Sequence, residues 1–451
     1  MTVHSKTALL GPKWVRDLRV EIEHGRITKL EQSSKPQQGD ICVDVLLPAL
    51  ANLHSHAFQR AMAGMTETRA AGRESFWTWR TLMYRFLDRL SPEQIEAIAA
   101  LVFMEMQEAG YASVGEFHYV HHQPGGTPYT QLSELSQRIF SAANQTGIGL
   151  THLPVLYTNG GVAQEPLAGG QLRFGNDVDS FLRLVEDCKP LLPNADSQIG
   201  IAPHSLRATS PDDLRRVLDQ TPEGPVHIHI SEQVQEVSDV EAALDQRPVE
   251  WLLNNAEVNE RWCLIHATHM TDDETRALAQ SGAVAGLCPI TEANLGDGIF
   301  NGAVFIENSG AFGVGSDSNV RISLPEELRT LEYSQRLRDK ARTVLVQGEG
   351  SVGQSLYTGA ARGGAQALGR EAGEIAVGQL ADMVAIDRSH PTLCSLRDDQ
   401  LLDGLSFAAP DGTVTDLWSA GRHQVRDGRH IARDAILTTY RAAMTDLLAD
   451  I

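Results

Sequence analysis

The sequence lacks the features of disulfide-stabilised, membrane-spanning and disordered proteins. Its five cysteines are odd in number and widely spaced, with no C-x-x-C pair, which argues against a disulfide framework and a zinc finger. The N-terminus has no apolar core followed by a cleavage site, and no run of roughly 18 apolar residues offers a membrane span. Hydrophobic residues make up 42% and charged residues 21%, as in folded enzymes. We therefore expect a globular cytoplasmic protein.

Basic residues are scarce relative to acidic ones. The chain has 38 Lys and Arg against 58 Asp and Glu, a formal charge of −20. This charge repels nucleic acid and anionic membranes, so we expect neither as a partner. An enzyme this acidic would have to concentrate arginines locally if its substrate were an anion, because the field of the whole protein opposes the capture of anions.

Signatures of several other enzyme classes are absent or weak. There is no G-x-S-x-G elbow and no phosphate-binding G-x-x-x-x-G-K-[ST] loop. One G-x-G-x-x-G run, residues 348–353, follows the apolar residues 343–346 and precedes Glu371 at about the spacing of a dinucleotide site. Residues 343–346 are more typical of the end of a helix that begins near Pro325, and no βαβ unit surrounds them. A dinucleotide-dependent enzyme is thus an alternative that nicotinamide binding would test.

From Pro48 onward, short apolar runs alternate with segments of helical periodicity. One predicted helix spans residues 91–108, where Ser91 caps the helix, Pro92 takes the first position and Gln94 completes a capping box. The predicted strands are residues 49–54, 111–117, 147–156, 199–203, 225–230, 262–266, 283–287 and 311–315. Eight strands with intervening helices predict a (β/α)8 TIM barrel.

Both chain ends have strand character instead. Residues 18–22 and 26–30 flank a turn at His24 and Gly25, and residues 381–387 and 416–425 precede a final helix ending near Leu448. A chain of 451 residues is expected to form more than one unit. The sequence predicts an α/β protein in which residues 48–372 form the barrel, while residues 1–47 and 373–451 form one small β-sandwich domain.

Histidines at the ends of predicted barrel strands indicate a metal site, because barrel enzymes place reactive groups there. His54 and His56 close the first strand as H-x-H and point to the same side. His229 lies near the end of the fifth strand and Asp317 follows the eighth. Three imidazoles and one carboxylate suit one divalent cation with a position left for water. Zn²⁺ is expected, although such sites also accept Fe²⁺, manganese and cobalt.

Glu232 and His266 follow the fifth and sixth strands and are available for proton transfer. Zinc lowers the pKa of water toward ~7. Hydrolytic cleavage of a carbon–nitrogen bond at such a site requires hydroxide attack on carbon and protonation of the leaving nitrogen. Glu232 is expected to deliver that proton and Asp317 to shuttle the proton of the water, while His266 orients or deprotonates the water or polarises the substrate. A lone histidine usually has a structural role. A structural role does not explain why histidines and acidic residues occur together at the ends of four predicted strands.

Other histidines are set aside. His227 has the same orientation as His229 but lies deeper, as a core group or one behind the ligands. His269 lies past the end of its strand, and His118, His121 and His122 are interpreted as loop residues.

Several motifs resemble the amidohydrolase superfamily. They are LPALANLHSH at residues 47–56, HIHISE at 227–232, LIHATH at 264–269, GSDSN at 315–319 and GQLADMV at 378–384. HAFQRAMAG at 56–64, EFHYVHH at 116–122, EELR at 326–329 and LEY at 331–333 are similar to the formiminoglutamate deiminase branch. The resemblance implies hydrolytic deamination of N-formimino-L-glutamate in histidine degradation, by a homodimer. No lysine ends the fourth strand, where binuclear relatives carry a bridging one, so a single zinc is implied.

The resemblance also implies how the substrate is held. In that family, a set of residues binds the glutamyl part of the substrate. These residues correspond to Gln59, Arg80, Tyr119, His204 and Arg207 in this sequence. The substrate has two carboxylates, which match the paired N–H donors of arginine. Without the resemblance, both arginines are interpreted as ordinary surface residues. A deaminase acting on a nucleobase or another amidine, and a non-catalytic metabolite-binding protein, are the remaining alternatives.

Overall fold

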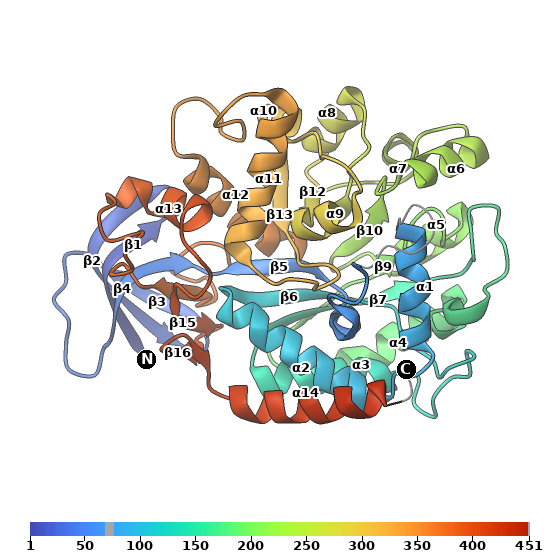
Figure 1. Cartoon of the computed structure of the whole chain (residues 1–451), viewed down its shortest axis with the longest axis horizontal. Coiled ribbons are helices and arrows are strands. Elements are labelled where there is room, and N and C mark those ends of the chain that lie inside the picture. Colours follow the sequence, from blue (N-terminus) through green and yellow to red (C-terminus); the bar gives the residue numbers. More distant parts are fainter. Residues whose placement is uncertain (68–75, 450–451) are drawn as a thin grey trace.

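A computed structural model describes residues 1–67 and 76–449. Its centre is a ring of parallel strands surrounded by helices (Figure 1). The strands of the ring are β5 (Leu50–Ser55), β6 (Tyr111–His118), β7 (Gly149–Leu156), β8 (Gln198–Ile199), β9 (Ala202–Pro203), β10 (Val226–Ile230), β11 (Trp262–His266), β12 (Val284–Leu287) and β13 (Ala311–Val314). Parallel bridges from Ile201 to Val226 and from Ser55 to Asp317 join its two sheets. The predicted (β/α)8 barrel is confirmed.

Helices follow the strands and cover the outside of the ring (Figure 1). The helices of the described residues are η1 (Ala57–Met62), α1 (Phe76–Leu87), α2 (Pro92–Glu108), α3 (Glu134–Thr146), η2 (Gly169–Arg173), α4 (Val178–Cys188), η3 (Lys189–Leu191), α5 (Pro211–Gln220), α6 (Val234–Leu244), α7 (Pro248–Asn255), α8 (Asp272–Gln280), α9 (Pro289–Leu295), α10 (Gly302–Glu307), α11 (Leu324–Asp339) and α12 (Val352–Ala367), and, after β14 of the small sheet, η4 (Asp398–Gln400), α13 (Leu401–Phe407) and α14 (Arg433–Leu448). Within the described residues, none of these helices has the length and apolar character needed to cross a bilayer.

The start of α2 shows how local sequence sets a boundary. The Ser91 hydroxyl accepts a hydrogen bond from the Gln94 backbone N–H at 3.2 Å, and the Gln94 side chain accepts one from the Ser91 N–H at 3.0 Å. Pro92 occupies the first helical position, where a backbone N–H would have no partner inside the helix. The predicted capping box is therefore confirmed.

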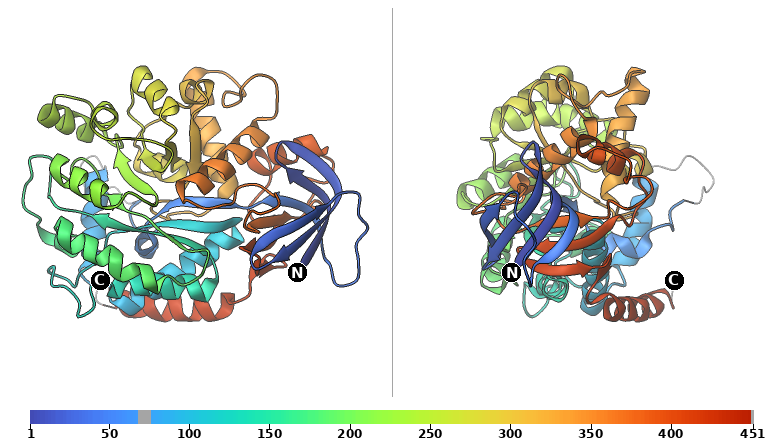
Figure 2. Two further views of the ribbon diagram at one scale, coloured as in Figure 1. Left: turned by 180° about the vertical axis from the view of Figure 1, so that it is seen from behind. Right: turned by 90° about the vertical axis from the view of Figure 1, so that its left-hand side faces the viewer.

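The two chain ends form one eight-stranded sheet, in the order β17-β16-β15-β14-β4-β1-β2-β3. Its strands are β1 (Thr2–Leu10), β2 (Lys13–Glu23), β3 (Arg26–Glu31), β4 (Ile41–Pro48), β14 (Met383–Ile386), β15 (Val414–Ser419), β16 (Arg422–Arg426) and β17 (Arg429–His430). The strands of both ends lie together in the two views of Figure 2. A bridge from Arg26 to Leu380 brings β3 back toward β14, so the sheet curls around its own apolar core, which includes Val20 and Trp418. The sheet lies at the amino-terminal ends of the barrel strands (Figure 1).

A buried ion-pair network holds the small sheet against the barrel. Arg370 donates to both carboxylate oxygens of Asp382, at 2.6 and 3.0 Å, and to Asp196 at 2.8 Å. Asp196, at the base of the fourth barrel position, also accepts from Arg422 of β16 at 2.6 Å. The side chains of Arg370 and Asp382 are almost fully buried. Paired, these charges are satisfied, but loss of one partner would leave an uncompensated charge inside the protein.

Three details differ from the sequence predictions. The fourth barrel position is not one strand over residues 199–203 but two short strands, β8 and β9. Residues 416–425 are not one strand but the hairpin of β15 and β16, because Ala420 and Gly421 have the positive φ values of a tight turn. The helix that begins near Pro325 ends at Asp339, so residues 343–346 are irregular rather than helical. In the described chain the element before the G-x-G-x-x-G run is the helix α11 and not a strand, and α12 starts inside the run.

We expect Asp382→Ala to lower the free energy of unfolding by about 3–5 kcal/mol, because Arg370 would lose its paired acceptor in a buried site. Urea unfolding followed by circular dichroism measures the effect. The matched control is Asp212→Ala, which breaks an exposed ion pair with Arg215 and should change stability by less than about 0.5 kcal/mol. Equal effects of the two substitutions would show that the buried network does not hold the parts together.

Candidate active site

Four of the predicted ligands converge at the carboxyl end of the barrel. The Nε2 atoms of His56 and His229 each lie 3.1 Å from Nε2 of His54. Asp317 Oδ1 lies 3.5 Å from His54 Nε2 and 3.3 Å from His56 Nε2. All four side chains are buried. The three imidazoles and the carboxylate thus surround one point.

The hydrogen bonds behind two of the rings show that this set fits a cation. Nδ1 of His56 lies 3.0 Å from the carbonyl oxygen of Phe117, and Nδ1 of His229 lies 3.2 Å from that of His204. A carbonyl only accepts, so each Nδ1 carries hydrogen and each Nε2 presents a lone pair. One proton on His54 Nε2 cannot satisfy two lone pairs and a carboxylate together. The ligand nitrogens of the three histidines lie close enough together to hold one metal ion, and Asp317 adds a carboxylate oxygen beside His54 and His56.

The backbone places Asp317 in this cluster. Its N–H donates to the carbonyl of His54 at 3.0 Å, and its carbonyl accepts from the N–H of His56 at 2.9 Å. Gly315 permits the close approach of the two segments, because a Cβ there would lie 2.7 Å from the carbonyl oxygen of His54. Asp317 itself has φ of 45°, an uncommon conformation for a residue with a side chain.

Burial keeps the three histidines neutral, as metal ligands must be. It lowers the pKa of His54 to about 3 and lowers the pKa of His56 and His229 below the ordinary value. Burial opposes the charge of Asp317 as well, yet the hydrogen bond with His54 holds the pKa of that carboxyl below its usual range. The predicted ligand set therefore consists of one negatively charged carboxylate, Asp317, and three neutral imidazoles.

Glu232 and His266 lie beside the cluster. His266 Nε2 is 3.7 Å from Glu232 Oε1 and 3.9 Å from Asp317 Oδ2. Burial raises the pKa of Glu232 to about 7. Burial opposes the charge of His266, but the carboxylates of Glu232 and Glu292 outweigh it and raise the pKa of His266. Both groups can therefore hold a proton near neutral pH.

The turn that carries Glu232 is fixed by another carboxylate. Glu236 accepts hydrogen bonds from the backbone N–H groups of Ser231 at 3.2 Å and Glu232 at 3.0 Å. Ser231 has a φ of 52°, so these bonds stabilise a strained turn beside the cluster.

The predicted substrate residues form the opposite wall of the same cavity. Gln59 Nε2 donates to the Tyr119 hydroxyl at 2.8 Å, and Arg80 Nη2 donates to the Tyr157 hydroxyl at 3.2 Å. His204 packs its ring against that of Tyr157, with 4.7 Å between centroids. Arg207 also lines the cavity, and burial together with Arg207 and Arg80 lowers the pKa of His204. The guanidinium groups of Arg80 and Arg207 thus line the same cavity as the histidine cluster.

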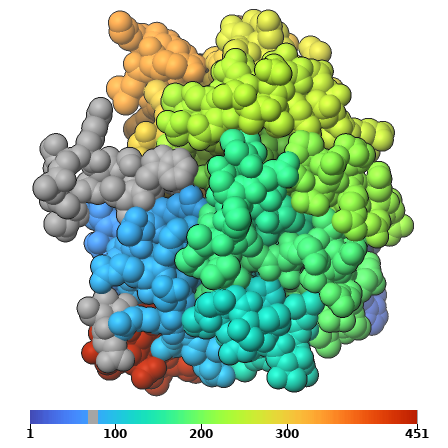
Figure 3. Space-filling model, turned by 90° about the vertical axis from the view of Figure 1, so that its right-hand side faces the viewer, coloured from blue at the N-terminus to red at the C-terminus, as the bar shows by residue number. Residues whose placement is uncertain are grey.

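The structure brings together all the predicted site residues. Every one of them lines this cavity except His54, which is fully buried at its base. Figure 3 looks onto this end of the barrel. Chain segments coloured from blue to yellow form most of the surface there. The histidines set aside from the sequence lie elsewhere: His227 Nε2 is 2.7 Å from the carbonyl of Ala367, and His269 Nε2 is 2.9 Å from that of Asp297. His118 is the last residue of β6, whereas His121 and His122 follow it in irregular chain as predicted, and all three side chains are buried.

Sequence reasoning missed Tyr157, Glu236 and Glu292. Tyr157 directly follows β7, so the rule applied to the other strand ends could have found it. Glu236 lies in α6, and Glu292 lies in α9 beyond the end of β12. Nothing in the spacing of either glutamate indicates that it reaches back to the site.

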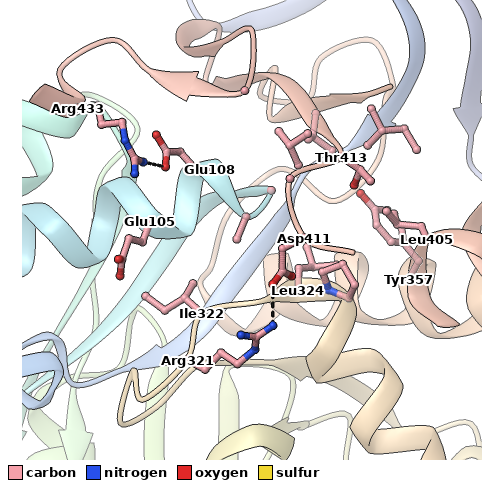
Figure 4. A pocket seen from close by; sticks show the side chains of 18 of the residues that line it. Glu105, Glu108, Arg321, Ile322, Leu324, Tyr357, Leu405, Asp411, Thr413 and Arg433 are labelled. Atoms are coloured by element: carbon pink, nitrogen blue, oxygen red, sulfur yellow. Dashed lines mark hydrogen bonds and ion pairs between the residues drawn. The ribbon is translucent and has the colours of Figure 1, made fainter. Parts of the chain in front are cut away.

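A larger cavity, about 520 Å³, lies between the barrel and the small sheet and shares no lining residue with the first. Figure 4 shows its charged side chains. Glu108 is paired with Arg433, and Asp411 with Arg321. Since these charges are neutralised by one another and no histidine lines the cavity, the smaller histidine-lined cavity is the candidate active site.

Comparisons with known proteins agree with this geometry. A family model described as "Amidohydrolase family" matches residues 45–423. The formimidoylglutamate deiminase of Pseudomonas aeruginosa is 46% identical over 449 residues, 99% of each chain. A 5-methylthioadenosine/S-adenosylhomocysteine deaminase of Natronomonas pharaonis is 24% identical over 445 residues, 94% of this chain and 90% of that protein.

Solved structures are similar over almost the whole chain. A crystal structure of an amidohydrolase from Brucella melitensis has a TM-score of 0.96 at 47% identity, covering 99% of this chain and 100% of that one. An adenosine deaminase from Xanthomonas campestris with bound zinc has a TM-score of 0.82 at 22% identity, covering 99% and 98%, a likeness of fold alone. The family match and the full-length relatives lead to one conclusion: the chain belongs to the amidohydrolase family of metal-dependent hydrolases.

Proposed function

We propose that this protein hydrolyses N-formimino-L-glutamate to N-formyl-L-glutamate and ammonia, a step of histidine degradation. The observation that carries the proposal is the presence of Arg80 and Arg207 in the cavity that also contains the histidine cluster. A substrate with two carboxylates needs such donors, above all in a chain of net charge −20. The full-length relative named formimidoylglutamate deiminase supports the same substrate.

His54, His56, His229 and Asp317 would hold one divalent cation, for which Zn²⁺ is the first choice and Fe²⁺ the second. When bound, the cation supplies Lewis-acid activation of water and of the substrate. The neutral imidazoles and the single carboxylate leave the site with a net positive charge when a divalent ion occupies it. Such a charge favours approach of a carboxylate-bearing substrate from the cavity.

The protein's own groups move the protons. Hydrolysis exchanges the imino nitrogen for the oxygen of water, so a proton must pass from water to the leaving nitrogen. Asp317 directs Oδ1 toward His54 and His56, and Oδ2 toward His266. In this proposal Asp317 accepts the proton of water, and Glu232 donates one to the nitrogen. His266 Nε2, within 4 Å of both carboxylates, orients them and the water between them.

Gln59, Arg80, Tyr119, His204 and Arg207 bind and orient the glutamyl part of the substrate in this proposal. Gln59 and Tyr119 already bond each other, and Tyr157 holds the Arg80 guanidinium. Donors fixed before the substrate arrives lose less conformational entropy on binding. The wall is thus organised for a polar chain rather than for a ring.

A nucleobase or nucleoside is the second candidate substrate. Relatives at 24% identity are named as adenosine-type deaminases, and aromatic rings of Tyr84, Tyr119 and Phe174 also line the cavity. These rings pack mainly against one another and against histidines, with 4.7 Å between the centroids of Tyr119 and Phe174. The two arginines therefore favour the acidic substrate.

Other features are also proposals. We infer a homodimer in the cytoplasm that needs neither nucleic acid nor a nicotinamide cofactor. We also infer two domains, with residues 48–372 as the catalytic barrel and residues 1–47 with 373–451 as the small β domain.

The substrate is tested by ammonia release from purified protein. We expect ammonia from N-formimino-L-glutamate and none from guanine, cytosine or adenosine, because only the first offers carboxylates to Arg80 and Arg207. A colorimetric ammonia assay with each compound at equal concentration distinguishes them. The reverse pattern would overturn the substrate assignment.

Chelation tests the metal. Dialysis against a strong chelator should abolish turnover, and one equivalent of Zn²⁺ per chain should restore it, because water at neutral pH needs Lewis-acid activation. His229→Asn should reduce bound metal in elemental analysis. His269→Asn, a histidine outside the cluster, is the matched control and should keep full metal content. Turnover that survives complete metal removal would contradict the proposal.

Arg207→Ala should raise KM for N-formimino-L-glutamate about 10–100-fold, because the substrate loses a hydrogen-bonded pair between its carboxylate and the guanidinium group. Steady-state kinetics and metal analysis of the same sample check this result. Arg215→Ala, an exposed arginine of α5, should leave KM unchanged. Metal loss in the Arg207 variant would count against a role in substrate binding.

A further inference from the structure

His56, His229 and His266 do not all have the same kind of hydrogen-bond partner at Nδ1. Nδ1 of His56 and of His229 faces a backbone carbonyl. Nδ1 of His266 instead lies 3.2 Å from a carboxylate oxygen, Oε1 of Glu292. A carbonyl fixes a neutral ring through one neutral bond, whereas a carboxylate binds the N–H more strongly. His266 is thus held differently from His56 and His229, two of the three histidines of the cluster.

Glu292 is itself fixed in place. It lies in α9, directly after β12, and its Oε1 also accepts a hydrogen bond from the Cys288 backbone N–H at 2.9 Å. The Glu292 side chain is 7% exposed. One oxygen therefore bonds both the start of α9 and the ring of His266, so the helix and the imidazole have a fixed relative position.

The backbone around His266 requires such support. His266 has φ of 67° and Ala267 has φ of 48°, two consecutive residues in the left-handed region. Each such residue with a side chain carries strain that its surroundings must balance. The ring is fully buried, and the bond to Glu292 fixes its rotation about the side-chain axis. Its Nε2 then faces Glu232 and Asp317.

We propose that Glu292 is a positioning residue that locks hydrogen on Nδ1 of His266 and aims Nε2 at Glu232 and Asp317. Glu292 touches neither the substrate nor the cation in this arrangement, and it acts only through the ring. The inference rests on the proposed hydrolysis, because the value of the aimed Nε2 atom is the proton transfer between water and the leaving nitrogen.

A competing interpretation is a second metal bound by His266, Cys288 and Glu292, whose ligand atoms lie within 4.8 Å of one another. The structure favours positioning. Burial raises the pKa of the Cys288 thiol well above its usual value, so the thiolate that a metal needs is disfavoured. Glu292 Oε1 is already bonded to the Cys288 N–H.

The test compares Glu292→Ala, Glu292→Gln and a matched control, Glu327→Gln. Glu327 is a buried carboxylate of α11 whose side chain reaches the start of α9, where it accepts a hydrogen bond from the Ile290 N–H at 2.9 Å. It therefore controls for loss of support to the same helix. Glutamine at 292 retains an oxygen acceptor for both N–H groups, so it should rescue the function that alanine removes.

We expect Glu292→Ala to lower kcat about 10–100-fold, the usual effect of removing a group that orients a catalytic or ligating histidine. KM and the bound metal should stay within about twofold of wild type, and Glu292→Gln should recover most of kcat. Glu327→Gln should behave as wild type. In the His266→Ala background, Glu292→Ala should cause no further loss of kcat, because both changes remove the same contribution.

A readout independent of turnover separates this inference from the proposed function. Crystal structures of wild type and Glu292→Ala should show the His266 ring rotated away from Glu232 only in the variant. If wild type releases no ammonia from N-formimino-L-glutamate but the ring still rotates, the function fails and the positioning role stands. An unmoved ring, additive losses in the double variant, or loss of a second metal equivalent would overturn the positioning role.

Discussion

The site depends on how the barrel closes, where the end of β13 meets the end of β5. The reciprocal hydrogen bonds of Asp317 with His54 and His56 set the register of that closure. A shift by one residue would turn Asp317 away from the histidines, since side chains alternate along a strand. Gly315 is needed at this crossing, because any side chain would contact the backbone of His54. The closure of the fold and the assembly of the donor set are therefore one event.

Around that closure, the acceptor at Nδ1 distinguishes His56 and His229 from His266. Backbone carbonyls hold the far nitrogens of His56 and His229, so their near nitrogens offer lone pairs. A carboxylate holds His266, and two more carboxylates face its other nitrogen. We therefore propose that identical side chains act as a metal ligand in one place and as a proton-holding group in another, according to the charge of their partners.

Charged residues are also unevenly distributed over the whole protein. The protein is strongly acidic, yet Arg80 and Arg207 line the candidate active site. Some arginines outside the site are paired with carboxylates, as Arg370 is with Asp382 at the joint between barrel and sheet and Arg321 is with Asp411 in the larger cavity. Such pairs neutralise charge within the protein, whereas we propose that the two arginines of the site bind an anionic ligand.

The sequence by itself determined the barrel, the small sheet from both chain ends and the cluster at the strand ends, because hydrophobic periodicity and strand-end position are local properties. Local patterns also predicted the cap at Ser91. Only the tertiary structure decided what stands behind each ring. Glu236 and Glu292 lie in helices, and they reach the site because the chain folds back after the strand. The break between β8 and β9 was equally invisible, since a continuous apolar run does not show which residues pair. Contacts between distant segments depend on the closed barrel, and no local spacing specifies them.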